Sequence, residues 1–148
     1  MNAIAGPAWA ARAVDAAGDV VVDLPGDWVV EVGPPTVARP AGWSGVAPAV
    51  VVAVEPDVVR GDDLAAAVVG AALARLGDPV VVDVRCPGDD VEIVVAHRHW
   101  GVDVTTVERH RCLGPRGRWI VSCSVPDTDL AGWAGAAQRI VASLVVVS

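Results

Sequence analysis

The sequence predicts an α/β protein of the α+β kind, in which a mostly antiparallel sheet of about six to seven strands carries helices on its faces. Its 148 residues include 33 valines but no phenylalanine, tyrosine or lysine, and valine's branched side chain favours strands. Two segments show apolar residues at helical spacing. Four strand-like segments lie between those two helices, and such a meander favours antiparallel pairing.

The length is typical of one domain, and no linker-like stretch divides the chain. We expect residues 1–18 to be a weakly helical or frayed segment and residues 19–148 to form a single α/β domain. The expected element order is β-β-β-α-β-β-β-β-α.

The first half of the chain contains three candidate strands. Two valine-rich runs, 19–24 and 27–32, flank Pro25-Gly26 and predict a hairpin. Residues 33–45 contain three prolines and predict an irregular loop. The apolar run 47–55 is typical of a central strand that is covered on both faces.

The two helices are expected over residues 62–76 and 128–144, with Asp62 and Asp127 as their respective caps. Gly77 ends the first helix. The apolar stripes that should face the sheet are Leu64, Ala65, Val68, Val69, Ala72, Leu73 and Leu76, and then Leu130, Trp133, Ala134, Ala137, Ile140, Val141 and Leu144.

The late strands are predicted over 80–85, 91–99, 102–112 and 118–125. A tight turn at Trp100-Gly101 opposes Arg98 with Asp103 and also Glu92 with Arg109, so one register satisfies two charge pairs. A four-residue turn then leads into the last strand and sets Val121 opposite His110. That strand alternates two sets of side chains, with Trp119, Val121, Cys123 and Val125 on one face and Arg118, Ile120, Ser122 and Ser124 on the other.

Charge and composition exclude several classes of protein. The net charge of −7 argues against a nucleic-acid binder. The longest apolar stretch, 46–54, is about half the length of a membrane-spanning helix, so no membrane insertion is expected. The N-terminus lacks the pattern of a secretory signal, which predicts a cytoplasmic location. Arginine without lysine is typical of a GC-rich bacterial genome.

No motif predicts a catalytic residue or a cofactor. The three cysteines lack a C-x-x-C spacing and should be reduced thiols that serve as small hydrophobes. Ser44 has no glycine at position 46 and cannot form a nucleophile elbow. Pro115 removes a backbone donor from the glycine-containing turn 114–117, which therefore is no phosphate loop.

Histidines offer a weak metal site. His97 and His99 point to one face of their strand, and a third ligand could come from Asp103 at the turn. His110 pairs near Val91, about 20 Å from His97. Surface or interface histidines explain the same pattern.

Two groups of residues are candidates for binding, although both also have structural explanations. The first is an arginine cluster on two strands at one turn, formed by Arg109, Arg111, Arg116 and Arg118. Alternation places Arg109 and Arg111 on one face with Arg118 nearby, so the cluster is either a solvated edge or a site for an acidic partner or anion. The second group is the tryptophans outside the core stripes, Trp9, Trp43 and Trp100, which either anchor a partner or a self-association face or cover the core.

Several local sequences, spread over residues 19–144, resemble the PsbP-like fold and, within it, the actinobacterial LpqN-type branch. They are the turn Val22-Asp-Leu-Pro-Gly-Asp-Trp28, the apolar strand before the 62–76 helix, the run Trp119-Ile-Val-Ser-Cys-Ser-Val-Pro126, and the helix end Ile140-Val-Ala-Ser-Leu144. Lipoproteins of that branch begin with a signal and a lipid-anchor cysteine. Neither is seen here, so the resemblance implies a cytoplasmic relative.

Members of the wider fold serve as a photosystem II accessory protein, a nuclear-import cofactor for a small GTPase, and bacterial envelope proteins. The resemblance therefore implies a non-enzymatic binding or accessory domain, self-associating or with a protein partner, in a secretion or envelope system. It supplies no catalytic residues. The alternative is a small-ligand-binding or hydrolytic domain that uses His97, His99 and Asp103.

Overall fold

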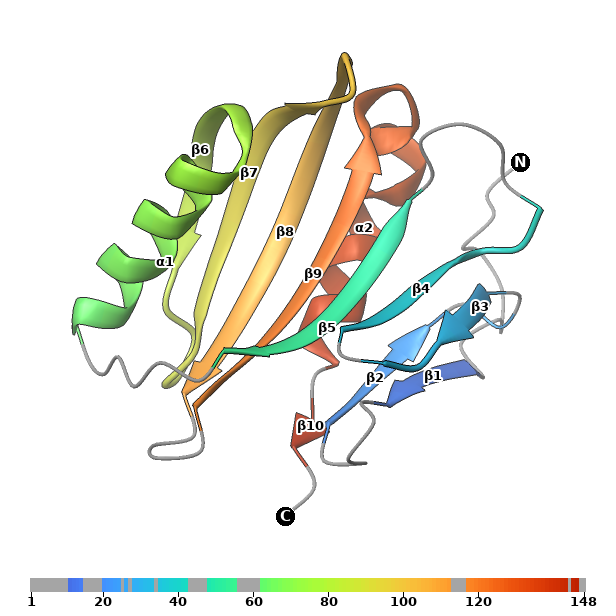
Figure 1. Ribbon diagram of the computed structural model, residues 1–148, viewed down its shortest axis with the longest axis horizontal. Helices are drawn as coiled ribbons and strands as arrows, with labels where there is room; N and C mark the ends of the chain where they lie inside the picture. Colours follow the sequence, from blue (N-terminus) through green and yellow to red (C-terminus); the bar gives the residue numbers. More distant parts are fainter. Residues whose placement is uncertain are drawn as a thin grey trace.

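A computed structural model describes residues 11–14, 20–24, 26, 28–33, 35–42, 48–55, 62–112, 117–143 and 145–146. Its main feature is a seven-stranded antiparallel sheet with the strand order β3-β4-β5-β9-β8-β7-β6 (Figure 1). The strands are β3 (Trp28–Glu31), β4 (Thr36–Pro40), β5 (Ala49–Glu55), β6 (Gly77–Arg85), β7 (Val91–His99), β8 (Val102–Cys112) and β9 (Arg118–Pro126). The α+β class predicted from the sequence is confirmed.

A second, three-stranded sheet has the order β1-β2-β10 and is built from Ala11–Val14, Val20–Leu24 and Val145–Val146. Residues 11–14 are therefore a strand, and the weak helix predicted around them is wrong for this stretch. The predicted hairpin of 19–24 with 27–32 is also wrong, because β2 pairs with β1 and β10 while β3 pairs with β4. Local turn residues could not reveal a partner strand more than a hundred residues away.

Strand β4 corrects the irregular loop predicted over 33–45. Thr36–Pro40 pairs with both β3 and β5. Pro35 precedes the strand and Pro40 ends it, so the missing amide groups leave the interior of the ladder intact. The prolines therefore mark the ends of a short strand, and residues 43–47 lie outside the described part of the chain.

The two helices pack on opposite faces of the large sheet (Figure 1). Helix α1 (Asp62–Arg75) covers β6 and β7, and α2 (Leu130–Ala142) covers β8 and β9 and also touches β2. Both helices confirm the sequence prediction. The predicted cap of α2 is wrong, since Asp127 lies in a short 3-10 helix (Asp127–Asp129), where it accepts a hydrogen bond from the Thr105 hydroxyl.

Two apolar clusters form the core. The larger lies between the sheet and α2 and includes Val52, Val121 and Ile140. The smaller lies between α1 and β7 and includes Val68 and Ile93. Leu73, predicted in the α1 stripe, is instead 48% exposed. Because successive side chains of a strand point to opposite faces of the sheet, valine-rich strands can supply side chains to both apolar clusters.

Cys123 belongs to the larger cluster, where burial raises the pKa of its thiol to about 12. A thiol with that pKa stays protonated at neutral pH, so Cys123 serves as a small hydrophobic side chain. Strand β5 is not covered on both faces as predicted. Val50 and Val52 join the core under α2, whereas Ala49 and Val51 line a cleft on the other face.

The predicted register of the β7–β8 hairpin is confirmed. Arg98 lies opposite Asp103, and Glu92 lies opposite Arg109. The next hairpin differs by one residue from the prediction, since His110 pairs with Ile120. A shift of one residue moves every side chain of a strand to the other face, which changes where Arg118 points.

Within the described residues, no helix combines the length and apolar character that crossing a bilayer requires.

Two glycines should respond in opposite ways to alanine. A Cβ on Gly77 would come within 2.8 Å of the Arg98 carbonyl oxygen, whereas a Cβ on Gly70, in the interior of α1, would meet nothing within 4 Å. We expect Gly77→Ala to lower the free energy of unfolding by about 1–3 kcal/mol and Gly70→Ala to raise it by about 0.5–1 kcal/mol. Urea denaturation followed by tryptophan fluorescence measures both. A Gly77→Ala variant as stable as Gly70→Ala would contradict the close approach of β6 to β7.

Candidate functional site

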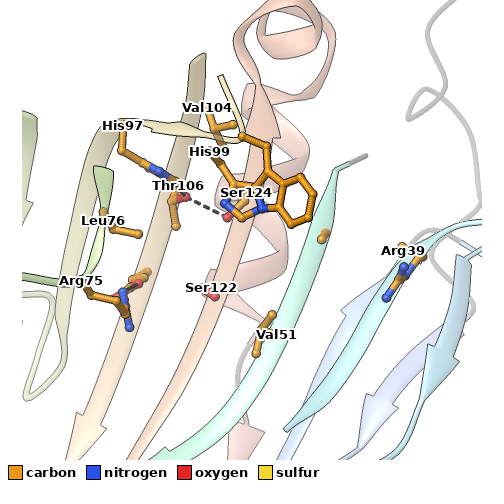
Figure 2. Close-up of a pocket in the computed structure, with 13 residues that line it drawn as sticks. Arg39, Val51, Arg75, Leu76, His97, His99, Val104, Thr106, Ser122 and Ser124 are labelled. Atoms are coloured by element: carbon orange, nitrogen blue, oxygen red, sulfur yellow. Dashed lines mark hydrogen bonds and ion pairs between the residues drawn. The ribbon is translucent and has the colours of Figure 1, made fainter. Parts of the chain in front are cut away.

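A cleft of about 1000 Å³ lies on the face of the sheet that carries α1 (Figure 2). Helix α1 packs over β6 and β7, and side chains of β8, β9, β5 and β4 line the cleft beside it. Leu76, directly after α1, forms part of one wall, and Val51 and Val104 supply apolar parts of the floor. The site thus exists because one helix is narrower than the sheet that it covers.

A chain of hydrogen bonds crosses the floor of this cleft (Figure 2). His97 Nε2 on β7 lies 2.7 Å from Thr106 Oγ1 on β8, which in turn lies 2.7 Å from Ser124 Oγ on β9. Burial lowers the pKa of His97, so its imidazole is neutral at neutral pH. Each group can donate or accept, and the direction of the chain depends on what meets its Ser124 end.

A buried carboxylate lies two residues further along β8. Glu108 contacts the Arg75 guanidinium, and its Oε1 lies 2.8 Å from His110 Nε2. Burial alone would raise the pKa of Glu108, but the hydrogen bonds and charges of His110 and Arg75 outweigh it and lower that pKa. Glu108 is therefore ionised at neutral pH and balances the charge of Arg75.

Arg39 lines the cleft from the β4 side and is exposed (Figure 2). Within the described part of the chain, no hydrogen bond or ion pair engages its side chain. By contrast, ion pairs with carboxylates hold Arg75, Arg85, Arg98, Arg109 and Arg111. Arg39 thus leaves an unbalanced positive charge in the cleft.

Trp100 lines the cleft from the tip of the β7–β8 hairpin and is 88% exposed. Its φ of 55° and the φ of 76° at Gly101 place both turn residues in the left-handed region. Such turns favour Asn-Gly, and a bulky residue there costs about 1–2 kcal/mol. The indole ring lies 5.9 Å from the His99 ring, centroid to centroid. The chain therefore keeps a large aromatic residue where turn chemistry favours a small polar one.

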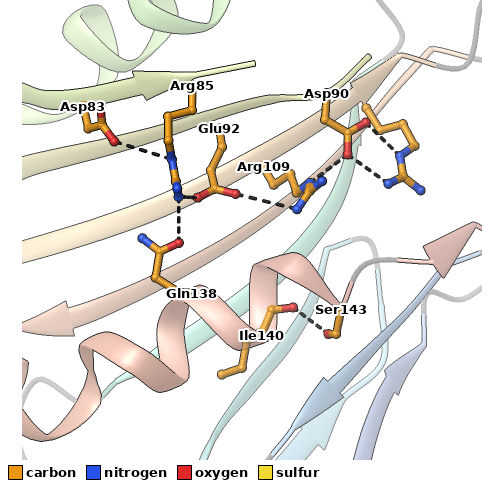
Figure 3. A network of polar contacts seen from close by, with 9 residues as sticks. Asp83, Arg85, Asp90, Glu92, Arg109, Gln138, Ile140 and Ser143 are labelled. Atoms are coloured by element: carbon orange, nitrogen blue, oxygen red, sulfur yellow. Dashed lines mark hydrogen bonds and ion pairs between the residues drawn. The ribbon is translucent and has the colours of Figure 1, made fainter. Parts of the chain in front are cut away.

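The three described arginines of the predicted cluster, Arg109, Arg111 and Arg118, do not share one surface. Arg109 and Arg111 lie on the α2 face, where both donate to Asp90 at 2.7 and 2.9 Å (Figure 3). Arg118 lies on the opposite face and is 5% exposed, because of the one-residue difference in register. Arg116 falls outside the described residues, as do Trp9 and Trp43.

Asp90 belongs to a larger network on that face (Figure 3). Arg109 also approaches Glu92 at 3.7 Å, and Glu92 contacts Arg85, which donates to Gln138 of α2. The network ties β6, β7 and β8 to the helix. It supplies carboxylates from within the chain to both arginines, so neither Arg109 nor Arg111 needs an external anion to balance its charge.

The candidate metal or hydrolytic set does not converge. His97 and His99 both line the cleft, as their shared face predicted. Asp103 lies on the other face of β8, paired with Arg98 at 2.9 Å. Among the described residues, no group of three His, Cys, Asp or Glu side chains is placed to hold a metal ion. Strand alternation explains the separation, since Asp103 is one residue from the cleft-lining Val104.

Sequence reasoning missed most of the cleft, namely Arg39, Arg75, Thr106, Glu108, Ser122 and Ser124. One signal was present. Ser122 and Ser124 lie on one face of a strand whose other face is apolar. This alternation indicates that the serine face is not part of the apolar core. The partners of these serines on β8 and β5 depend on strand pairing and carried no local signal.

Solved structures with the same arrangement match nearly the whole chain. The Ran-binding protein Mog1p of Saccharomyces cerevisiae matches with a TM-score of 0.63 and 13% identity, over 93% of this chain and 95% of its own. Cyanobacterial PsbP (CyanoP) of Synechocystis sp. PCC 6803 matches with a TM-score of 0.58 and 15% identity, over 97% and 96%. The chain has the PsbP-like fold.

LpqN of Mycobacterium tuberculosis, which is involved in cell envelope biogenesis, matches the chain with a TM-score of 0.58 and 14% identity, over 92% of this chain and 90% of its own. No family model and no curated sequence matches the chain. Identities this low establish a shared fold and leave partner and branch open.

The Asp90 network makes stability depend on pH. Burial opposes ionisation of Asp90, but Arg111 and Arg109 outweigh it, so the pKa of Asp90 is lowered in the folded chain. Its stabilisation is therefore complete above the unfolded pKa, about 3.9, and is lost as the pH falls through the lower folded pKa. We expect Asp90→Asn to lower the free energy of unfolding by about 2 kcal/mol at pH 7.

That difference between wild type and Asp90→Asn should shrink below about pH 4. Urea denaturation at pH 7 and pH 3 measures it, with Asp89→Asn as the matched control, because Asp89 is exposed and adjacent. An equal deficit of Asp90→Asn at both pH values would contradict an ionised Asp90 in the network.

Proposed function

We propose that this PsbP-like chain is a non-enzymatic binding domain whose cleft receives a segment of a partner protein. The observation that carries the proposal is Trp100, an aromatic side chain that is 88% exposed at the edge of the cleft and held in a left-handed turn. Backbone strain of this kind is concentrated at functional sites. Tryptophan is also among the residues that contribute most to protein–protein affinity.

The shape and lining of the cleft support binding over hydrolysis. The alternative function, hydrolysis by His97, His99 and Asp103, requires these three side chains to lie together. Asp103 instead lies on the opposite face of the sheet. Apolar walls with a few linked polar groups at the floor are typical of recognition sites. His97 itself is engaged with Thr106.

The structural similarity to Mog1p and LpqN also supports an accessory role. Mog1p is a Ran-binding protein, and LpqN is involved in cell envelope biogenesis. By analogy, we propose that the chain is an accessory protein of an envelope or secretion system, close to the LpqN-type branch. A cytoplasmic location stays a prediction. The analogy concerns only the setting, and the proposal of a binding cleft rests on Trp100.

Replacing Trp100 should separate binding from folding. Trp100→Asn supplies the residue that the turn favours, so the free energy of unfolding should stay equal or rise by up to about 1 kcal/mol. Loss of an exposed aromatic anchor should weaken a cleft-bound partner about 30-fold, which corresponds to about 2 kcal/mol. Affinity capture from the native cell extract, followed by calorimetry with the purified partner, measures the loss.

Val32→Asn is the matched control, since Val32 is 64% exposed and does not line the cleft. The proposal requires a protein that the wild type and Val32→Asn capture and Trp100→Asn does not. If all three chains captured the same proteins with equal affinity, the proposal would be wrong.

A further inference from the structure

We propose that the segment received by this cleft is acidic, with one carboxylate docked over Ala49 between the guanidinium of Arg39 and the hydroxyl of Ser124. The inference rests on the proposed function and adds the chemistry of the partner. Three features of the cleft support it: its charge balance, the positions of its polar groups across the strands, and the length of chain that it can hold.

The charge balance is unusual for this protein. The chain carries a net charge of −7, yet the charged residues that line the cleft are two arginines and one glutamate. Glu108 balances Arg75, so Arg39 remains. Covering a guanidinium without supplying a counter-charge is costly, and complementary charge selects partners. A segment that covers Arg39 therefore has to bring its own carboxylate.

Strand register places the polar groups in one row. Val37 pairs with Val51 and Ala38 with Val50, so the next residue, Arg39, lies beside Ala49. Ala49 pairs with Ser124 on β9, and Ser124 with Thr106 on β8. Arg39 and Ser124 are thus two strands apart, about 10 Å between backbones, with only the alanine methyl group between them. The long arginine side chain and a carboxylate can together bridge that gap.

The chain of hydrogen bonds across the floor of the cleft ends at the Ser124 hydroxyl, which can donate to the docked carboxylate. With an anion at its end, His97 Nε2–H donates to Thr106 Oγ1, the Thr106 hydroxyl donates to Ser124 Oγ, and the Ser124 hydroxyl donates to the carboxylate. Neutral histidine can supply the first donor, and burial keeps His97 in that form. Hydrogen bonds to a charged acceptor are about twice as strong as neutral ones.

The size of the cleft determines the length of the segment. Strands β7 and β4 are separated by four strand spacings, about 19 Å, which matches about six residues of extended chain. Such a segment reaches across the sheet from β7 to Arg39 on β4. A small carboxylic acid would contact only one end of a cleft of about 1000 Å³. The arrangement therefore fits a short peptide with an apolar residue near Trp100 and an Asp or Glu near Arg39.

Selection from a phage-displayed library of random octapeptides tests the charge preference. The targets are the wild type, Arg39→Glu and the control Arg139→Glu, which makes the same charge reversal on an exposed residue of α2 on the other face. We expect the wild type and Arg139→Glu to enrich peptides with Asp or Glu beside an apolar residue. Arg39→Glu should lose that enrichment and favour Lys or Arg.

A fluorescently labelled peptide from the selection then tests the contact itself. By fluorescence anisotropy, changing its carboxylate to an amide should weaken binding to the wild type about tenfold, and to Arg39→Gln less than about twofold. Ser124→Ala should weaken the carboxylate peptide severalfold and the amide peptide less. Equal losses on the wild type and Arg39→Gln would overturn the inference.

The outcomes separate this inference from the proposed function. Peptides without acidic enrichment, whose binding Trp100→Asn abolishes, would overturn the acidic segment and leave the binding cleft standing. A wild-type chain that enriches no peptide would contradict both.

Discussion

The pairing of β5 with β9 is the contact on which the rest of the structure depends. It joins the strands of the first half of the chain to the meander of the second half through seven residue pairs, Ala49 to Glu55 against Ser124 to Arg118. Without it the sheet would be two smaller ones. With it the sheet is wider than α1 can cover, and a cleft remains beside the helix. The same pairing sets Ala49 beside Ser124 and thereby builds the floor of the candidate site.

Buried polar side chains are arranged differently on the two faces of the sheet. On the α2 face, Asp90 and Glu92 pair with arginines, and one of these, Arg85, also donates to Gln138 of α2, so that a closed network links strands and helix. On the cleft face, the chain from His97 through Thr106 ends at the half-buried Ser124. Buried polar groups without partners are destabilising. A chain that ends at a cleft can find its last partner in a ligand, whereas the closed network needs none.

Sequence reasoning succeeded where a local pattern and the tertiary contact agreed. The bounds of β7 and β8 and the pairs of Arg98 with Asp103 and Glu92 with Arg109 were predictable, because a two-residue turn leaves one register and opposite charges support it. The β8–β9 connection lacks such a pair, and an error of one residue put Arg118 on the wrong face. Strands β1, β4 and β10 were missed, because each is at most five residues long. In addition, prolines flank β4, and the partner of β10 is the distant strand β2.

The amino-acid sequence by itself determined the α+β class, the two helices and the position of Trp100 at a turn, since valine content, helical spacing and turn residues act over a few neighbouring residues. Only the tertiary structure decided that Asp103 lies apart from His97 and His99, that Asp90 lies between two arginines, and that Arg39 faces Ser124 across Ala49. Those relations depend on which strands pair and in which register. That choice follows from burial summed over the whole sheet, which no single segment encodes.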